Sequence, residues 1–243
     1  MEGFDPATSF GPDVARRYDD ELRGDEAETV DFLARLAGSG PALELAIGTG
    51  RIALPLRERG IRVDGIELSP DMVARLREKP GGAEVEVTMG DMARASAPGQ
   101  GYALAYLVFN TLYNILTQDD QVRCFENVAR HLAPGGVFVV EGSVPPADAP
   151  TQQFLAAERV ANDQVVLDVN RYDPVTQLLD EQHVTLTNDG VRLGPISQRL
   201  IWPSEMDLMA RIAGMRLAER WGGWNGEPFA AAGRRHVSVY ALS

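Results

Sequence analysis

Blocks of apolar and polar residues alternate along the chain and predict strands and helices in turn. Short apolar runs bounded by turn residues predict buried strands, and the segments between them have helical spacing. The predicted strands cover 42–47, 61–66, 85–88, 102–109, 137–140, 215–221 and 236–242. Strands that alternate with helices indicate an α/β fold. We therefore expect a doubly wound, mostly parallel, seven-stranded Rossmann-like sheet.

The pattern changes after the fifth strand. Period-two stretches separated by turns predict an antiparallel meander over 164–172, 178–187 and 191–201. A helix is expected before them, at 154–160, and two amphipathic helices are expected near the start of the chain, within 12–38.

These patterns predict a single domain over residues 1–243. It would carry an N-terminal helical cap in 1–40 and an antiparallel β insertion in 143–202. The insertion and the loop 222–233 both leave the carboxyl ends of strands, where open α/β sheets bind ligands. We expect both to wall a substrate pocket.

The turn after the first strand carries the strongest chemical signal. Gly48-Thr49-Gly50 leads into a predicted helix, and Glu67 ends the next strand. Glycines allow the backbone to approach a ligand closely, and a helix start presents unpaired N–H groups. An acidic residue about 20 positions past such glycines can accept both hydroxyls of a ribose. The segment predicts a nucleoside-cofactor site.

Two cofactor classes fit this turn. Gly48, Gly50 and Ala53 match the dinucleotide pattern of NAD-linked oxidoreductases. Glu44 favours the other class, because a carboxylate in an otherwise apolar strand is costly without a partner. The ammonium of S-adenosyl-L-methionine (SAM) would supply that partner. On these residues the chain resembles class I SAM-dependent methyltransferases, although it has Ala46 where many members have glycine.

The resemblance implies that the cofactor is SAM, that the product is S-adenosyl-L-homocysteine, and that no metal takes part. Gly90-Asp91-Met92 would hold the adenine, and Tyr18 would lie across the methionine end. The implied cofactor-binding residues are Tyr18, Glu44, Ala46, Gly48, Thr49, Gly50, Arg51, Glu67, Leu68, Met72, Gly90, Asp91, Met92 and Phe109.

The loop after the fourth strand faces the transferred methyl group in this family. The implied catalytic residues are Tyr18, Asn110 and Tyr113, and the implied substrate contacts are Tyr113, Asn114, His183 and Trp224. The loop lacks the Pro-Pro-aromatic motif of enzymes that methylate nucleobase amino groups. His131, His183 and His236 have no partner at metal-ligand spacing, and only His183 lies where a base would be useful.

Composition excludes several partners. A net charge of −12 argues against nucleic acid, because phosphate binding needs a basic surface. No apolar run approaches the about 20 residues of a membrane span, and the acidic start does not look like a signal peptide. The single cysteine fits a cytoplasmic protein. A small-molecule substrate is expected, and a homo-oligomer is compatible with the sequence.

The overall resemblance is to bacterial small-molecule methyltransferases of secondary metabolism, including amino-sugar N-methyltransferases of antibiotic pathways. The shared features are the Tyr-Asp pair in the cap, the Ala-x-Gly-Thr-Gly turn and the β-rich insertion. An amine acceptor must only arrive neutral, whereas a hydroxyl needs a positioned base. We therefore expect in-line methyl transfer to nitrogen. The alternatives are an O-methyltransferase, an NAD-linked oxidoreductase and a non-catalytic SAM-binding protein.

Overall fold

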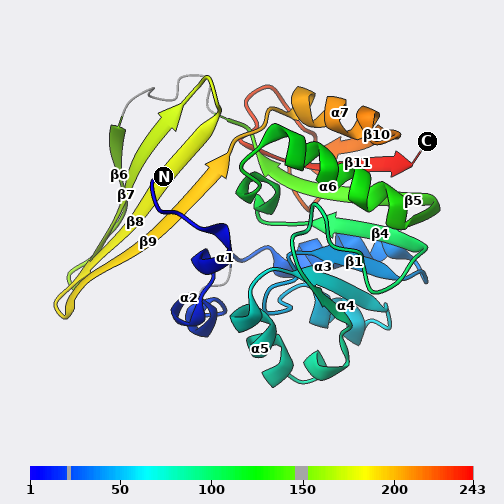
Figure 1. Ribbon diagram of the computed structural model, residues 1–243, viewed down its shortest axis with the longest axis horizontal. Coiled ribbons are helices and arrows are strands. Elements are labelled where there is room, and N and C mark those ends of the chain that lie inside the picture. The colour runs from blue at the N-terminus through cyan, green and yellow to red at the C-terminus, as the bar shows by residue number, and fades with distance from the viewer. Residues whose placement is uncertain (21–22, 146–152, 243) are drawn as a thin grey trace.

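The computed structural model describes residues 1–20, 23–145 and 153–242, and its main body is a seven-stranded sheet covered by helices (Figure 1). The strand order is β10-β11-β5-β4-β1-β2-β3, and β11 alone runs antiparallel to both of its neighbours. This confirms the predicted doubly wound sheet. The strands are β1 (Ala42–Leu45), β2 (Val63–Glu67), β3 (Val87–Met89), β4 (Tyr102–Leu107), β5 (Leu132–Ser143), β10 (Met215–Trp221) and β11 (Arg235–Leu242).

Helices cover both faces of this sheet. On one face, Phe32, Leu56 and Leu76 belong to a single apolar core, and they come from α3 (Glu26–Ala37), α4 (Ala53–Glu58) and α5 (Pro70–Glu78). On the other face, Phe125 and Met206 belong to a second core, and they come from α6 (Gln118–His131) and α7 (Pro203–Ile212). Burial of apolar area on both faces is the main force that holds the layers together. Among the helices of the described residues, none is long and apolar enough to cross a membrane.

Two helices begin at a residue whose side chain caps the first turn. The Ser69 hydroxyl accepts the Met72 N–H at 3.2 Å at the start of α5, and Thr117 caps α6 in the same way. A capping oxygen satisfies one of the N–H groups that a helix start leaves unpaired. Both caps lie at the carboxyl edge of the sheet, so they also place the first turns of α5 and α6 beside the cavity described below.

The N-terminal cap contains the two predicted helices and a further short one. The predicted pair is α2 (Pro12–Arg17) and α3, and the additional helix is α1 (Pro6–Ser9). The last strand of the insertion contacts α1, so the start of the chain lies between the main sheet and the insertion (Figure 1).

The insertion is a separate four-stranded antiparallel sheet that projects beyond the carboxyl end of β5 (Figure 1). Its strands are β6 (Gln153–Val160), β7 (Gln164–Asp173), β8 (Leu178–Thr187) and β9 (Gly190–Arg199). The helix predicted at 154–160 is wrong, because this segment pairs with the edge of β7, with Leu155 opposite Val169. Such pairing overrides local preference. Residues 146–152 of the predicted insertion lie outside the described residues.

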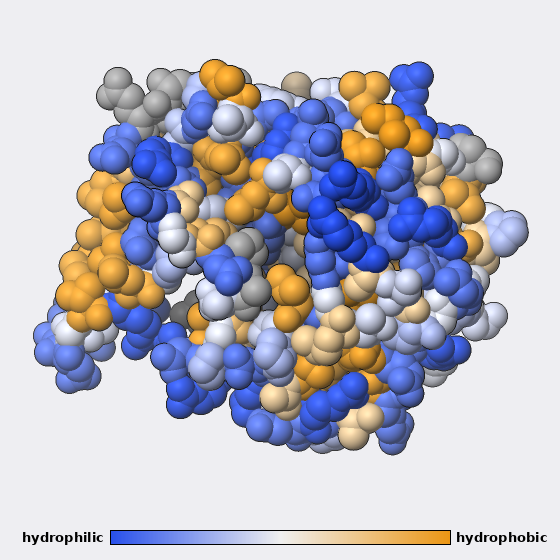
Figure 2. All heavy atoms as spheres, viewed as in Figure 1, coloured by the Kyte–Doolittle hydropathy of each residue, from blue (hydrophilic) through white to orange (hydrophobic). Residues whose placement is uncertain are grey.

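The two faces of the insertion differ in chemistry. Adjacent residues of a strand point to opposite faces, and cross-strand partners share one. Asp168 and His183 are partners, so their face is polar. The opposite face is apolar and exposed, as Figure 2 shows at the left of the molecule. Its exposed apolar residues are Leu155, Val160, Val169, Val191 and Leu193.

Candidate active site

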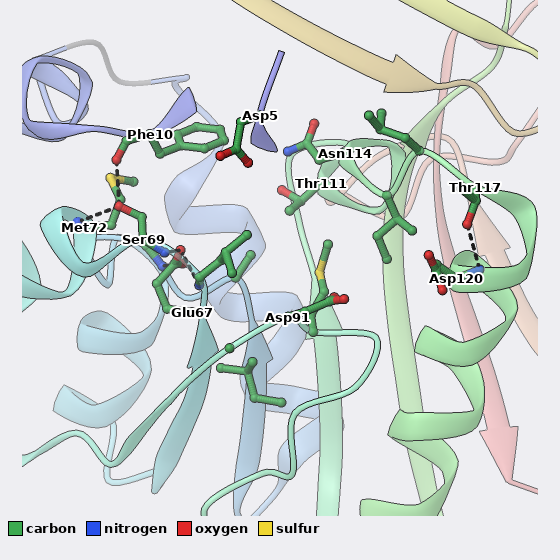
Figure 3. A pocket seen from close by; sticks show the side chains of 18 of the residues that line it. Asp5, Phe10, Glu67, Ser69, Met72, Asp91, Thr111, Asn114, Thr117 and Asp120 are labelled. Carbon is green, nitrogen blue, oxygen red and sulfur yellow. Dashed lines mark hydrogen bonds between the residues drawn. The ribbon is translucent and has the colours of Figure 1, made fainter. Parts of the chain in front are cut away.

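A cavity of about 440 Å³ lies at the carboxyl edge of the main sheet (Figure 3). The strand ends and the turns after β1, β2, β3 and β4 line one part of it, and the N-terminal segment lines another. Among the residues that the sequence singles out, those in the lining are Tyr18, Ala46, Gly48, Glu67, Leu68, Met72, Gly90, Asp91, Met92 and Asn114.

Glu67 organises the floor of the cavity. One carboxylate oxygen accepts the Gly48 N–H at 2.8 Å, and the other accepts the N–H groups of Leu68 and Ser69, each at 2.8 Å. Only 6% of the residue is exposed, and burial raises the pKa of the carboxyl. A lone pair remains on the oxygen that accepts the Gly48 N–H, so the side chain can fix the loop and still accept a hydroxyl from the cavity.

The glycine turn has a backbone that favours glycine. Gly48 has φ +58°, and Ala46 adopts φ +52°, in the left-handed region where a side chain is strained. A glycine would adopt the conformation of Ala46 without that strain. An added Cβ at Gly48 would lie 3.2 Å from Met72 Cε, so the turn and α5 pack closely there.

The Tyr-Asp pair of the cap is anchored to this turn. Asp19 accepts the Thr49 hydroxyl at 2.7 Å and pairs with Lys79 at 2.7 Å, while Lys79 also donates to the Thr49 carbonyl at 2.8 Å. These contacts hold the preceding residue, Tyr18, against the cavity. Thr49 itself is buried, and it acts on the site through the cap.

Tyr18 forms an aromatic wall with Phe10. The two rings meet edge to face with centroids 6.2 Å apart, and both line the cavity. The Arg51 guanidinium lies 4.6 Å from the Tyr18 ring centre and 5.4 Å from that of Phe109, and it also donates to the Tyr18 carbonyl. Burial raises the pKa of the Tyr18 phenol. The hydroxyl is therefore a donor at neutral pH.

Glu44 lies behind the cavity wall. Its carboxyl is buried, and the Tyr106 hydroxyl donates to it at 2.9 Å. Burial raises the pKa of Glu44 to about 8. The backbone of Ala53 also hydrogen-bonds to this carboxyl. The expected contact with a cofactor ammonium stays a prediction.

The turn after β3 lies opposite Glu67 in the cavity. Asp91 accepts the Ala93 N–H at 2.8 Å and pairs with Arg94 at 2.6 Å. Its side chain still borders the cavity, together with Gly90 and Met92 (Figure 3). An acceptor group therefore stands where the sequence predicts the adenine.

The loop after β4 is strained. Phe109 and Asn110 both have positive φ, of 62° and 59°. The Phe109 N–H donates to Glu141 at 2.6 Å, and the Arg23 guanidinium lies 4.2 Å from the Phe109 ring centre. Two successive left-handed residues need such support, and strain of this kind concentrates at functional sites. The loop then delivers Thr111 and Asn114 to the cavity.

Several predicted site residues do not border the cavity. Tyr113 is fully buried and donates to the Ser143 carbonyl at 2.6 Å, and Trp224 is 4% exposed and packs edge to face on Phe32. The substrate contacts of Tyr113 and Trp224 stay predictions. Both side chains are buried, so such contacts would require the residues packed around them to move. The others outside the lining are Glu44, Thr49, Gly50, Arg51, Phe109, Asn110 and His183.

His183 has acidic partners that the sequence analysis did not predict. Its Nδ1 lies 2.5 Å from Asp168, and its Nε2 lies 3.0 Å from Glu181. Glu158, Asp168 and His183 each offer one ligand atom, and these atoms lie within 4.8 Å of one another. The absence of a partner at ligand spacing was therefore a wrong inference, because strand pairing rather than sequence spacing brings Asp168 opposite the ring. No residue of the described insertion lines the cavity, so this group stands apart from it.

Residues that sequence reasoning missed form the remaining walls. Asp5 and Phe10 come from the N-terminal segment, which has no periodic pattern to place it. Ser69, Thr117 and Asp120 could have been found, since they belong to helix starts at the carboxyl edge of the sheet. The other missed lining residues are Ile66, Thr111, Ile115 and Leu116.

Known proteins share this architecture. The family described as "Methyltransferase domain" matches residues 42–136. The structure of the CcbJ methyltransferase from Streptomyces caelestis is 36% identical, with a TM-score of 0.91 over 99% of this chain and 100% of that one. The cypemycin N-terminal methyltransferase of a Streptomyces species is 27% identical over 81% of both chains.

A further similarity covers about half of each chain. It is to dTDP-4-amino-2,3,4,6-tetradeoxy-D-glucose N,N-dimethyltransferase from Saccharopolyspora spinosa, which is 34% identical over 141 residues, 54% of this chain and 55% of that one.

Proposed function

Because the chain belongs to the SAM-dependent methyltransferases, we propose that it transfers a methyl group to an amine nitrogen of a small-molecule acceptor. The charge of the cavity carries this proposal. Four acidic residues line it, and the described lining contains no lysine, arginine or histidine. A negative cavity favours a cationic cofactor and an acceptor that becomes positive as it is methylated. The four are Asp5, Glu67, Asp91 and Asp120.

The lining residues fit SAM. Glu67 keeps a lone pair for a ribose hydroxyl, and Asp91 can accept an adenine amino group. Gly48 has no side chain, so a ligand can approach the backbone of the turn closely. SAM supplies an electrophilic methyl group on a sulfonium, and S-adenosyl-L-homocysteine remains. The chain positions both partners and excludes water around them.

Nitrogen is favoured over oxygen by the available side chains. A hydroxyl acceptor needs a base near neutral pKa, and the described lining has no histidine for that role. Burial raises the pKa of Tyr18, which makes that phenol a poor base as well. Two of the similar proteins are named for methylation at an N-terminus or at nitrogen, which supports the same choice.

Calorimetry with SAM, S-adenosyl-L-homocysteine and NAD tests the cofactor, and methyl-labelled SAM with paired acceptors tests the atom. Each pair would consist of an amino sugar and the sugar with a hydroxyl in place of the amine. We expect binding of SAM and its product, no binding of NAD, and label only on the amine. Label on the hydroxyl partner would overturn the choice of nitrogen. Binding of NAD without SAM would overturn the proposal as a whole.

A further inference from the structure

A cluster of titratable side chains lies on the polar face of the insertion, away from the cavity of the candidate active site. Its members come from three neighbouring strands, β6, β7 and β8 (Figure 1). Glu158 of β6, Asp168 of β7 and His183 of β8 each place a ligand atom within 4.8 Å of the other two. Glu181 of β8 lies beside them, with its Oε1 3.0 Å from His183 Nε2.

The cluster gathers three carboxylates around one imidazole. Glu158, Asp168 and Glu181 can carry three negative charges, and a protonated His183 neutralises only one of them. In the part of the chain that the structure describes, neither a lysine nor an arginine pairs with these carboxylates. Like charges held this close together favour the binding of a further cation.

The two ring nitrogens of His183 have different neighbours. Nδ1 lies 2.5 Å from Asp168, and Nε2 lies 3.0 Å from Glu181. A metal-binding histidine commonly donates its second N–H to a carboxylate, which fixes the tautomer and the ring orientation. This arrangement makes Nδ1 the ligand atom and Glu181 the group that holds the ring. The ring binds a metal in its neutral form, so the metal takes the place of the proton between Nδ1 and Asp168.

A buried amide oxygen on the same face lacks a hydrogen-bond partner. Asn170 is 5% exposed, and its Nδ2 donates to the Asp168 carbonyl at 3.4 Å. It follows Asp168 by two residues and lies opposite Glu181, so its side chain shares the face of the cluster. Its Oδ1 has no partner among the described residues. Buried polar atoms are normally satisfied, so a further donor is expected here.

We propose that Glu158, Asp168 and His183 bind a divalent first-row metal ion such as Zn²⁺, and that Glu181 holds the histidine ring in place. Imidazole nitrogen and carboxylate oxygen are ligands that zinc accepts, and three protein ligands leave the fourth position to water. That water supplies the donor that Asn170 Oδ1 lacks. The site goes beyond the proposed methyl transfer, because it lies outside the cavity.

The ion connects β6 to the rest of the insertion. β6 is an edge strand that pairs only with β7, and its register shifts between Ala157 and Arg159, where Glu158 lies. Such a bulge leaves a residue without a partner in the strand ladder and redirects its side chain. Metal bonds from Glu158 to Asp168 and His183 therefore add a second attachment for this strand. Because the unfolded chain does not hold the ligands together, bound Zn²⁺ should stabilise the fold.

Calorimetry with Zn²⁺ alone tests the site in the full chain. We expect about one equivalent to bind the wild type. Glu158→Gln, Asp168→Asn and His183→Gln should each bind it at least about tenfold more weakly. Glu158 is exposed, so its variant tests the site without a change at a buried position. Asp189→Asn is the matched control, since Asp189 is an exposed carboxylate in the turn between β8 and β9. It should bind Zn²⁺ as the wild type does.

Other side chains of the kind that zinc prefers are buried. His131 is 5% exposed, His236 is 0% exposed, and the single cysteine, Cys124, is also buried. A loss of binding in His183→Gln therefore reports on this cluster. Urea titrations give a second measurement, in which Zn²⁺ should raise the midpoint of the wild type and of Asp189→Asn more than that of Glu158→Gln.

Two results would overturn the metal site. One is a wild type that binds no Zn²⁺, and the other is equal affinity in the wild type and the three ligand variants, which would mean adventitious binding elsewhere. Both results leave the proposed methyl transfer standing, because none of the cluster residues lines the cavity.

Discussion

Burial of Glu44 changes what this side chain does when a cation arrives. Its pKa is raised to about 8 by burial, so the carboxyl holds a proton over most of the neutral range. A nearby cofactor ammonium would favour the ionised form and lower that pKa. We therefore expect the negative charge of Glu44 to form when SAM binds.

Binding of SAM at pH 7 should accordingly release up to about one proton from Glu44. Affinity should rise with pH until about 8, where the free carboxyl is already ionised. Calorimetry in buffers of different ionisation enthalpy measures the released proton. Glu44→Gln should abolish the release, and Asp64→Asn, at a buried carboxylate nearer the start of β2, should leave it unchanged. A wild-type binding enthalpy independent of buffer would contradict this role.

Both the backbone conformation and the packing at position 50 require glycine. It has φ +75°, and an added Cβ would overlap the buried Leu76 side chain. Gly60 has φ +84° with nothing within 4 Å of an added Cβ. We expect Gly50→Ala to lower the free energy of unfolding by about 2–4 kcal/mol and Gly60→Ala by about 1–2 kcal/mol, in urea titrations. Equal losses would show that packing at Gly50 is unimportant.

At the scale of elements, sequence patterns located the sheet because its strands are buried runs bounded by turns. Helices such as α5 and α6 occupy segments of helical spacing between these strands, and Ser69 and Thr117 cap their starts. The failure at β6 has a physical cause: its strand form depends on a partner edge that only the folded chain supplies. The position of α1 depends on contacts with β9, which no local pattern encodes.

The polar face of the insertion should respond to pH through His183. Hydrogen bonding to Glu181, with Asp168 on the other ring nitrogen, raises the pKa of His183 to about 9. A raised histidine pKa stabilises the fold fully below about 6.5, and that contribution is lost as pH rises through 9. The side chain is 42% exposed, so solvent screening keeps the contribution below about 1 kcal/mol.

His183→Gln should therefore be less stable than the wild type at pH 6 and equally stable at pH 10. Urea titrations at several pH values, followed through the insertion's β-sheet signal, measure the difference. An equal difference in the free energy of unfolding at both pH values would mean that the His183 ring acts through packing rather than charge.

At the scale of the whole molecule, the cavity could be predicted only in part. The strand ends and turns were found because connectivity alone brings them to one edge of the sheet. Asp5 and Phe10 were missed because a segment without periodicity reaches the site only through tertiary contacts, such as that between Phe10 and Ser69. The insertion, expected as a wall, instead lies beside this segment.

A largely buried ion pair joins the insertion to the main body. Arg199, at the end of β9, is 6% exposed and pairs with Glu205 of α7 at 2.8 Å, while it donates to Gln121 of α6 and to Gln177. Removal of one partner would leave the other charge poorly solvated. Arg199→Met should therefore lower the free energy of unfolding by about 3–5 kcal/mol.

A double variant shows whether the loss of stability in Arg199→Met comes from the unpaired charge of Glu205 or from the lost hydrogen bonds of Arg199. Arg199→Met combined with Glu205→Met should recover most of the loss, because no unpaired charge remains. Arg171→Met is the control in the same insertion, since its pair with Asp180 is exposed on the arginine side and should cost less than about 1 kcal/mol. None of these residues lines the cavity, so SAM affinity should be unchanged in all variants that fold. A double variant as unstable as Arg199→Met would mean that the insertion is held by the specific hydrogen bonds of Arg199.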